Sequence, residues 1–189
     1  MWNVLWILLA LTAVVGGYVV LTYNRLVALH RRTQEAWSDI QVQMKRRYDL
    51  IPNLVESVKG YAGHERSTLE AVVRARAAAV ADQGSPSSQA QTEGALQSAL
   101  RGLFALAENY PQLRASESFL ALQKDLADTE DRIQSSRRFY NGSVRDLNTL
   151  IGQFPSNLVA GGFGFAPREF FELEAGDAAA RQPVQVRFS

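Results

Sequence analysis

Apolar residues recur at steps of three or four through the middle of the chain, from residue 36 to residue 62. Charged residues occupy the opposite side, so this stretch predicts a helix with one buried face. Pro52 lies inside the pattern, where it removes one backbone donor and crowds the carbonyl group of Tyr48. Because the apolar stripe continues beyond it, we expect a kink rather than a helix end. The stripe consists of Trp37, Ile40, Met44, Tyr48, Ile51, Val55, Val58 and Ala62.

Residues 1–24 contain no charged side chain and predict a membrane-spanning helix. At about 1.5 Å per residue they are long enough to cross a bilayer core of roughly 30 Å. A cleavable signal peptide is disfavoured, because no basic segment precedes the apolar run and no small-x-small site precedes Tyr23. Trp2 and Trp6 at one end, with Tyr18 and Tyr23 near the other, suit the two membrane interfaces.

The basic residues beside this span predict its orientation. Arg25, Arg31 and Arg32 follow the apolar run and no Lys or Arg precedes it. The one apolar run predicts a single pass. Because positive charge favours the cytoplasmic side, we expect a short N-terminus outside and the following chain in the cytoplasm. Ala13 and Gly17 would let two such helices approach closely, although small residues are common in membrane helices and incidental composition explains them equally well.

No turn signal separates the span from the stripe, so the pattern predicts one long helix that leaves the membrane and becomes the first helix of a bundle. We expect this helix to continue to a Gly-, Pro- and Ser-rich loop at residues 82–91. Gly60 and Gly63 weaken it by roughly 1 kcal/mol each relative to Ala, and a break there stays open.

Two further helices follow. One begins between Ser87 and Thr92 and is ended by Pro111. The other begins at Ser116, continues to Pro155 and repeats its apolar positions about every 3.5 residues, which is typical of helices that pack in a coiled-coil manner. Its predicted inward positions are Phe119, Leu122, Leu126, Thr129, Ile133, Ser136, Tyr140, Val144, Leu147, Ile151 and Phe154.

These patterns predict an all-α protein in which the transmembrane helix continues into an elongated antiparallel bundle of three to four long helices. We expect an anchor at residues 1–24, a bundle at 25–155 and an irregular Gly- and Phe-rich tail at 156–189. Val184, Val186 and Phe188 alternate in the tail as in a short strand. Packing on its own bundle, docking on another subunit and recognition of a partner all stay open for the tail.

Composition excludes several kinds of function. The net charge of +1 and the absence of a basic patch with exposed aromatic residues argue against nucleic-acid binding. Without cysteine there is no disulfide, thiolate metal site, lipid-modified cysteine or cysteine nucleophile.

The remaining motifs supply no chemistry. His30 and His64 are far apart in the chain, and neither stands in a metal-binding spacing such as H-E-x-x-H or Glu-x-x-His. The glycines of residues 161–164 follow no strand and precede no Gly-Lys-Ser/Thr, so they form no phosphate loop. We therefore predict no catalytic residue, no metal site and no cofactor.

Clustered charges predict ion pairs between helices. Lys45, Arg46 and Arg47 stand beside Asp49, and a second group lies at residues 130–138. Three consecutive positions cover about 200° of a helix, so they cannot all face water in a bundle. We expect Arg47 or Arg46 to pair with an acidic residue of the last helix. A solvated helix face is the alternative. The second group comprises Glu130, Asp131, Arg137 and Arg138.

Several segments resemble the LemA family of bacterial membrane proteins. They are residues 37–62, residues 108–123, T-E-D-R-I (129–133), R-R-F-Y-N (137–141) and F-P-S-N-L-V-A (154–160). The resemblance extends over residues 23–171 in the same order, with Ser136 in place of an expected alanine. It implies a membrane-anchored helical bundle with its N-terminus outside, and it supplies no catalytic residue. Some members of this family are linked with membrane remodelling in magnetosome formation, and members are often encoded near membrane zinc proteases of the HtpX type.

We expect a non-enzymatic scaffold that self-associates at the bacterial inner membrane and takes part in membrane organisation or remodelling. Its partners would be the lipid bilayer and further copies of the chain. The alternative is an adaptor or regulator of another membrane protein, such as an HtpX-type protease. In that case the tail or the charge cluster at residues 45–49 would make the contact. An enzyme of unknown type is the third and least favoured class.

Overall fold

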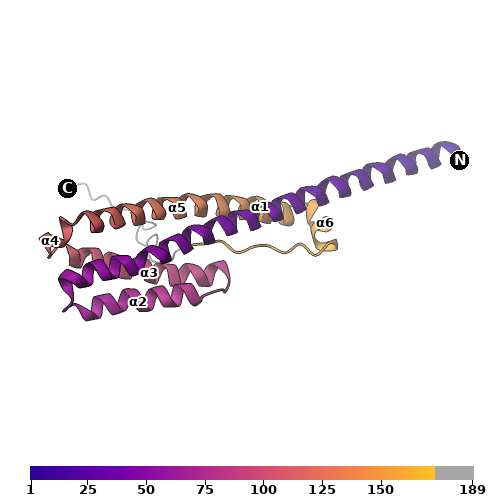
Figure 1. Ribbon diagram of the computed structural model, residues 1–189. Helices are drawn as coiled ribbons and strands as arrows, with labels where there is room; N and C mark the ends of the chain where they lie inside the picture. The colour runs from indigo at the N-terminus through magenta and orange to yellow at the C-terminus, as the bar shows by residue number, and fades with distance from the viewer. Residues whose placement is uncertain (173–189) are drawn as a thin grey trace, which may run out of the picture. The chain divides into compact units, whose positions relative to one another are not determined.

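The computed structural model describes residues 1–172, and all regular secondary structure within them is helical (Figure 1). This confirms the predicted all-α class. The strand predicted at residues 184–188 lies outside the described residues, and the division at residues 24 and 155 stays a prediction. The helices are α1 (Trp2–Ala62), α2 (Arg66–Ala81), α3 (Pro86–Ala107), α4 (Pro111–Arg114), α5 (Glu117–Gly152) and α6 (Ser156–Gly162).

The chain forms two compact units. Unit 1 comprises Met1–Asp39 and Arg138–Arg168, and unit 2 comprises Ile40–Arg137 together with the described residues 169–172. Helices α1 and α5 each contribute one part to unit 1 and another to unit 2.

Helix α1 confirms one part of the predicted long helix and corrects another. It continues through Pro52 as expected, but it ends at Ala62 instead of continuing to the loop at 82–91. The chain reverses there, and α2 returns beside α1 (Figure 1). A Cβ atom at Gly63 would lie 3.0 Å from the carbonyl oxygen of Lys59, so glycine suits this tight turn. The helix break that the sequence left open near Gly60 and Gly63 is therefore present, and it lies at Gly63, after the end of α1.

Pro52 leaves the carbonyl oxygen of Tyr48 without its normal helical donor, because proline has no backbone N–H. Arg76 of α2 supplies the missing donor: its Nε donates to the Tyr48 oxygen at 2.7 Å. The chain reversal therefore places Arg76 beside the position in α1 where Pro52 removes a backbone hydrogen bond.

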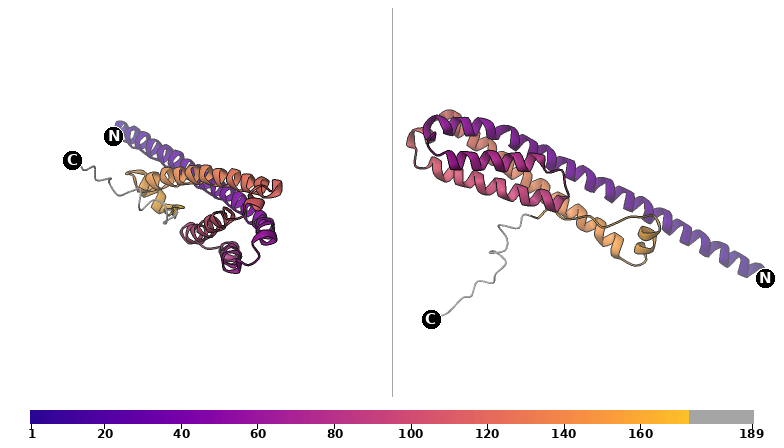
Figure 2. Two further views of the ribbon diagram at one scale, coloured as in Figure 1. Left: turned by 90° about the vertical axis from the view of Figure 1, so that its left-hand side faces the viewer. Right: turned by 90° about the horizontal axis from the view of Figure 1, so that it is seen from below.

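The core of unit 2 is formed by apolar faces of α1, α2, α3, α4 and α5. Helices α2 and α3 run antiparallel and side by side in every view (Figure 1, Figure 2). Helix α3 begins at Pro86, with the side chain of Ser85 accepting a hydrogen bond from the Ser88 amide at 3.4 Å. Pro111, predicted only to end a helix, also begins the short helix α4. Fully buried core residues include Ile51, Leu54, Val58, Val72, Leu96, Leu103 and Leu113.

In unit 1, the first part of α1 and the last part of α5 run antiparallel. Leu26 packs with Leu147 at one level, and the rings of Trp37 and Tyr140 lie 5.2 Å apart at another. The apolar repeat predicted for α5 is confirmed at most positions. Phe154 is the exception, because α5 ends at Gly152 and the side chain is 79% exposed. The buried positions of the repeat are Phe119, Leu126, Thr129, Ile133, Tyr140, Val144 and Leu147.

Helix α6 occupies residues whose composition predicts an irregular segment. The hydroxyl group of Ser156 donates to the carbonyl oxygens of Leu150, at 2.7 Å, and Gln153, at 2.9 Å, and so fastens the corner between α5 and α6. Val159 and Ala160 are buried against Leu26 and Leu147. Tertiary packing therefore gives this Gly-rich segment a helix that its composition does not favour.

We predict that Arg76→Met lowers the free energy of unfolding by about 1.5–3 kcal/mol, the range of hydrogen bonds to charged groups. In a Pro52→Ala background the new backbone amide at position 52 would serve the Tyr48 oxygen, so the same change should cost less. Urea unfolding of the four proteins in this double-mutant cycle measures the difference. Arg74→Met is the matched control, because the Arg74 side chain is 71% exposed. Equal costs in both backgrounds would contradict the assignment.

Candidate functional site

A cluster of charged side chains lies buried in unit 2. Arg47 of α1 forms ion pairs with Glu93 of α3 and Glu130 of α5, and its Nη1 donates to Glu130 Oε2 at 2.6 Å. Arg47 and Glu93 are each 3% exposed, whereas the Glu130 side chain is 27% exposed. We call these three residues the ionic cluster. It joins three helices through one guanidinium group.

Neutral donors also bind both carboxylates of the ionic cluster. The hydroxyl group of Tyr48 donates to Glu93 Oε1. Two amides donate to Glu130 Oε1, from Gln97 Nε2 at 3.2 Å and from Gln134 Nε2 at 2.8 Å. Since buried carboxylates are costly unless they accept hydrogen bonds, these donors explain how two acids are held beside one arginine.

Burial sets the electrostatics of the ionic cluster. It lowers the pKa of Arg47 from its ordinary value, and the Glu130 carboxylate opposes that shift. Burial likewise raises the pKa of Tyr48, while the charge of Arg47 opposes that rise. Tyr48 therefore remains a neutral donor at physiological pH. The arrangement is suited to holding three helices together.

A small cavity of about 260 Å³ adjoins the ionic cluster. Arg47, Gln97 and Glu130 form its polar part, and Phe104 and Leu126 contribute apolar walls. Its volume has room for water molecules beside the cluster.

The structure confirms the pairing of Arg47 with an acid of the last long helix. Arg46 is exposed, and Lys45 forms a surface pair with Asp49 at 3.3 Å. Glu93 was not among the predicted partners, although a signal was present, because this glutamate lies three residues before Leu96 on the buried stripe of α3. In the second charge group, Arg137 is half-buried and Arg138 is exposed.

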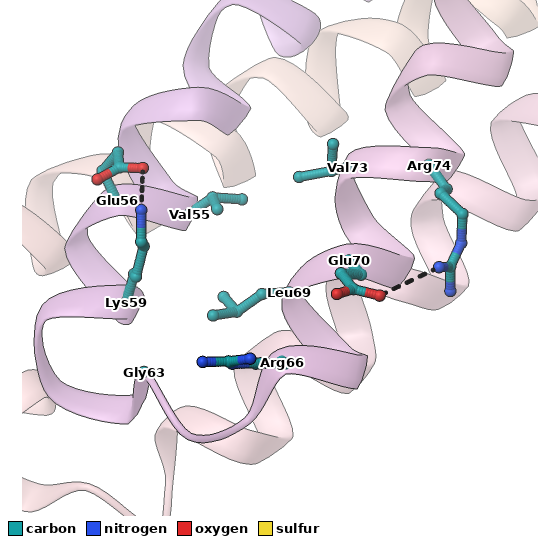
Figure 3. Close-up of a pocket in the computed structure, with 9 residues that line it drawn as sticks. All are labelled: Val55, Glu56, Lys59, Gly63, Arg66, Leu69, Glu70, Val73 and Arg74. Carbon is teal, nitrogen blue, oxygen red and sulfur yellow. Dashed lines mark hydrogen bonds and ion pairs between the residues drawn. The ribbon is translucent and has the colours of Figure 1, made fainter.

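A groove of about 730 Å³ opens between α1 and α2, and we call it the α1–α2 groove (Figure 3). Val55, Leu69 and Val73 point into it from the two helices. Charged pairs form its rims, with Lys59 bonded to Glu56 at 3.3 Å and Arg74 bonded to Glu70 at 3.4 Å. The sequence did not predict this groove, because the apolar pattern continues from α1 into α2 as if the two helices were one.

The two histidines occupy different surroundings. His64 is exposed in the turn between α1 and α2. His30 lies in unit 1, where Arg168 Nη2 donates to its Nε2 at 3.1 Å and the Phe165 ring lies 6.2 Å away. Across residues 1–172, no three His, Asp or Glu side chains are grouped as metal ligands.

The contact at His30 belongs to a segment that returns along α1 after α6. Asn148 fixes the backbone of Arg168, because its amide donates to the Arg168 oxygen at 2.9 Å and its oxygen accepts from the Arg168 N–H at 2.8 Å. Desolvation lowers the pKa of His30, and the charges of Arg168 and Arg31 lower it further. Since arginine can only donate, Nε2 must be the unprotonated acceptor.

We predict that Arg47→Glu destabilises the protein by about 3–5 kcal/mol or more, because it leaves the acids of the ionic cluster buried without a cation. Thermal unfolding followed by circular dichroism measures the effect as a lower Tm. Lys45→Glu is the control, since the Lys45 side chain is 78% exposed and should change stability by only about 0.5 kcal/mol. An unchanged Tm for Arg47→Glu would refute the structural role of the cluster.

We further predict that acid loosens the segment at Arg168. The folded pKa of His30 lies below the unfolded value, so its contribution is complete above about pH 6.5 and is lost as the pH falls through the folded pKa. The hydrogen-exchange protection factor of the Arg168 amide should therefore fall between about pH 7.5 and about pH 5. His30→Gln keeps an acceptor that does not titrate and should abolish the change, whereas His64→Gln should retain it. A constant protection factor in the unmodified protein would contradict this prediction.

The beginning of α1 is the segment suited to a membrane. Among residues 1–172, α1 is the one helix long and apolar enough to cross a bilayer, and the side chains of that apolar stretch are not buried. Side chains such as Leu9 and Val14 are more than half exposed. In water this surface would be unfavourable, whereas lipid would cover it.

Comparison with known proteins agrees with this anatomy. A family model described as the LemA family matches residues 36–188. Magnetosome protein MamQ of Magnetospirillum gryphiswaldense is 27% identical over 191 aligned residues, which cover 87% of this chain and 70% of the relative. Protein LemA of Metamycoplasma hominis is 30% identical over 140 residues, covering 72% of this chain and 63% of the relative.

These relatives have names that denote no reaction. Together with the exposed apolar part of α1, the relationship indicates a membrane-associated protein. The family match covers most of the chain and includes the residues of the ionic cluster and the α1–α2 groove. The chain therefore belongs to the LemA family.

Proposed function

We propose that this protein is a non-enzymatic scaffold, anchored once in the bacterial inner membrane, that associates with further copies of itself. The observation that carries the proposal is the continuity of α1, whose exposed, uncharged first turns lead without interruption into the helix that bears Arg47. One helix thus supplies both the anchor and a central part of the packed core. Two relatives are named as magnetosome proteins, and this agrees with the role in membrane organisation or remodelling that the family resemblance implies.

The charges beside the apolar run support the orientation of the anchor. Arg25, Arg31 and Arg32 are exposed where the run ends, and no Lys or Arg precedes it. By the positive-inside rule, the N-terminus lies outside and the chain after residue 25 lies in the cytoplasm.

Two features support self-association. Added Cβ atoms at Gly16 and Gly17 would meet no other atom within 4 Å, so this face of α1 is open to a second helix. The α1–α2 groove offers an apolar floor between charged rims, which is the composition of a protein interface.

The groove also supports an alternative role. An amphipathic helix of another membrane protein, such as an HtpX-type protease, would place its apolar side on Val55, Leu69 and Val73. In that case the protein would act as an adaptor or regulator, and its complexes would contain a second polypeptide.

Mass measurement of particles extracted in mild detergent at endogenous expression distinguishes these roles. We predict a uniform homo-oligomer whose mass falls when Val73→Glu introduces a charge into the groove. Val73 is 52% exposed, so the change should leave the fold intact. Val42→Glu is the matched control, because Val42 is 62% exposed on α1 and does not line the groove.

The outcomes separate the two classes. A monomer or dimer that carries a second protein, and loses it with Val73→Glu, would favour the adaptor. A monomer without a companion would contradict both roles. Deletion of residues 172–189 tests the tail in the same measurement, and an unchanged mass would exclude it from self-association.

A further inference from the structure

The segment from the end of α5 through α6, residues 153–163, exposes three large apolar side chains, and we call this segment the α5–α6 corner. Phe154 is 79% exposed, Leu158 is 66% exposed and Phe163 is 57% exposed. Their exposure does not mean that this segment lacks packing, because Val159 and Ala160 of α6 are buried. One side of α6 therefore packs inward, while the other presents apolar groups outward.

The sequence around this corner carries no charge. Every residue from Leu147 to Pro167 is uncharged, and Asp146 and Arg168 flank this run. The surface of a water-soluble protein is usually rich in charged residues, whereas charged side chains are costly in the apolar part of a bilayer.

The corner lies against the end of the membrane-spanning run of α1. The ring of Phe163 lies 4.8 Å from that of Tyr23, and the ring of Phe165 lies 6.0 Å from it. Val19 packs against the small core that contains Val159 and Ala160. Figure 1 and Figure 2 show α6 beside this part of α1. The corner is therefore level with the last turns of the apolar run.

We infer that the α5–α6 corner enters the interfacial layer of the bilayer beside α1 and forms a second membrane contact. This inference rests on the proposed membrane anchoring of residues 1–24. A bilayer that encloses Val19 would also meet the segment that packs on Val19, and this contact favours lipid as the occupant of the exposed apolar face. Aromatic side chains favour this layer, and an amphipathic helix lies in it with its apolar face toward the acyl chains.

The surrounding charges agree with that placement. Arg25 is exposed one residue beyond the uncharged run of α1, where its cation would meet lipid phosphates. The membrane would then hold unit 1 at two points. A single helix is free to rotate about its axis in the bilayer, whereas a second contact beside it fixes that rotation.

The absence of cysteine makes a direct test simple, because one introduced cysteine carries one label. Single variants Phe154→Cys, Leu158→Cys, Val14→Cys and Phe139→Cys of the full chain would be labelled with an environment-sensitive fluorophore. They would be reconstituted in lipid nanodiscs at one copy per disc and, in a parallel sample, at several copies per disc. Quenching is compared between lipids with a nitroxide near the headgroup, lipids with a nitroxide deep in the acyl chain, and aqueous iodide.

Val14 and Phe139 are the controls. Val14 is 69% exposed in the middle of the apolar run and should be quenched by the deep nitroxide. Phe139 is 47% exposed on α5, about 20 Å along the helix from its end, and should be quenched by iodide. If Val14 is not quenched by lipid nitroxides, the proposed anchoring itself fails.

We expect the labels at Phe154 and Leu158 to be quenched most by the shallow nitroxide and to be protected from iodide. Iodide quenching equal to that of the Phe139 label, with Val14 in lipid, would overturn the inference and leave the anchoring intact. Protection without lipid quenching, found only in discs that hold several copies, would assign this surface to a second copy and would equally overturn it.

Discussion

The buried guanidinium group of Arg47 constrains the packing of unit 2. It is compatible with the interior only where the carboxylates of Glu93 and Glu130 meet it, so α1, α3 and α5 must be aligned at one level. Displacement of one helix by a turn of about 5.4 Å would separate the charges. Apolar contacts penalise such a displacement less, because one aliphatic side chain can replace another. Buried ion pairs add little net stability, so we assign the ionic cluster to the choice of register.

Side chains also supply hydrogen bonds at three places where the backbone departs from a regular helix. Arg76 serves the carbonyl oxygen that Pro52 leaves without a donor, and Ser156 binds two carbonyl oxygens at the α5–α6 corner. Asn148 pairs with both backbone groups of Arg168. In each case a side chain supplies hydrogen bonds that the regular helix no longer provides. These contacts allow the irregular segments to be ordered.

Regular periodicity made much of the fold predictable. The stripe of α1 and the repeat of α5 follow directly from the spacing of buried residues, and the pairing of Arg47 follows because adjacent helical positions cannot all face water. The reversal at Gly63 was not predictable in the same way, since the apolar phase of Leu69 and Val72 resumes after the turn as if α1 continued. The α1–α2 groove depends on that reversal and could not be predicted without it.

The other differences arise from tertiary contacts that a local pattern does not contain. Composition predicted an irregular segment after Pro155, but burial of Val159 and the hydrogen bonds of Ser156 stabilise α6. Phe154 continued the repeat in sequence, yet the helix ends two residues earlier and the ring projects outward. For Glu93 the local pattern did contain a signal, because this acid lies on the apolar stripe of α3. The sequence did not show that its partner is Arg47.

The residues of the ionic cluster lie far apart in the chain, and this affects the order in which the protein can fold during its synthesis. Glu130 follows Arg47 by 83 residues, so the apolar run of α1 and the whole of α2 and α3 are made before the last member of the cluster exists. Until then, water must solvate Arg47, because a buried charge without its partners is unfavourable. If the apolar run is the anchor that we propose, it can reach the membrane before the packed core closes, and the order of residues in the chain becomes an order of events in its assembly.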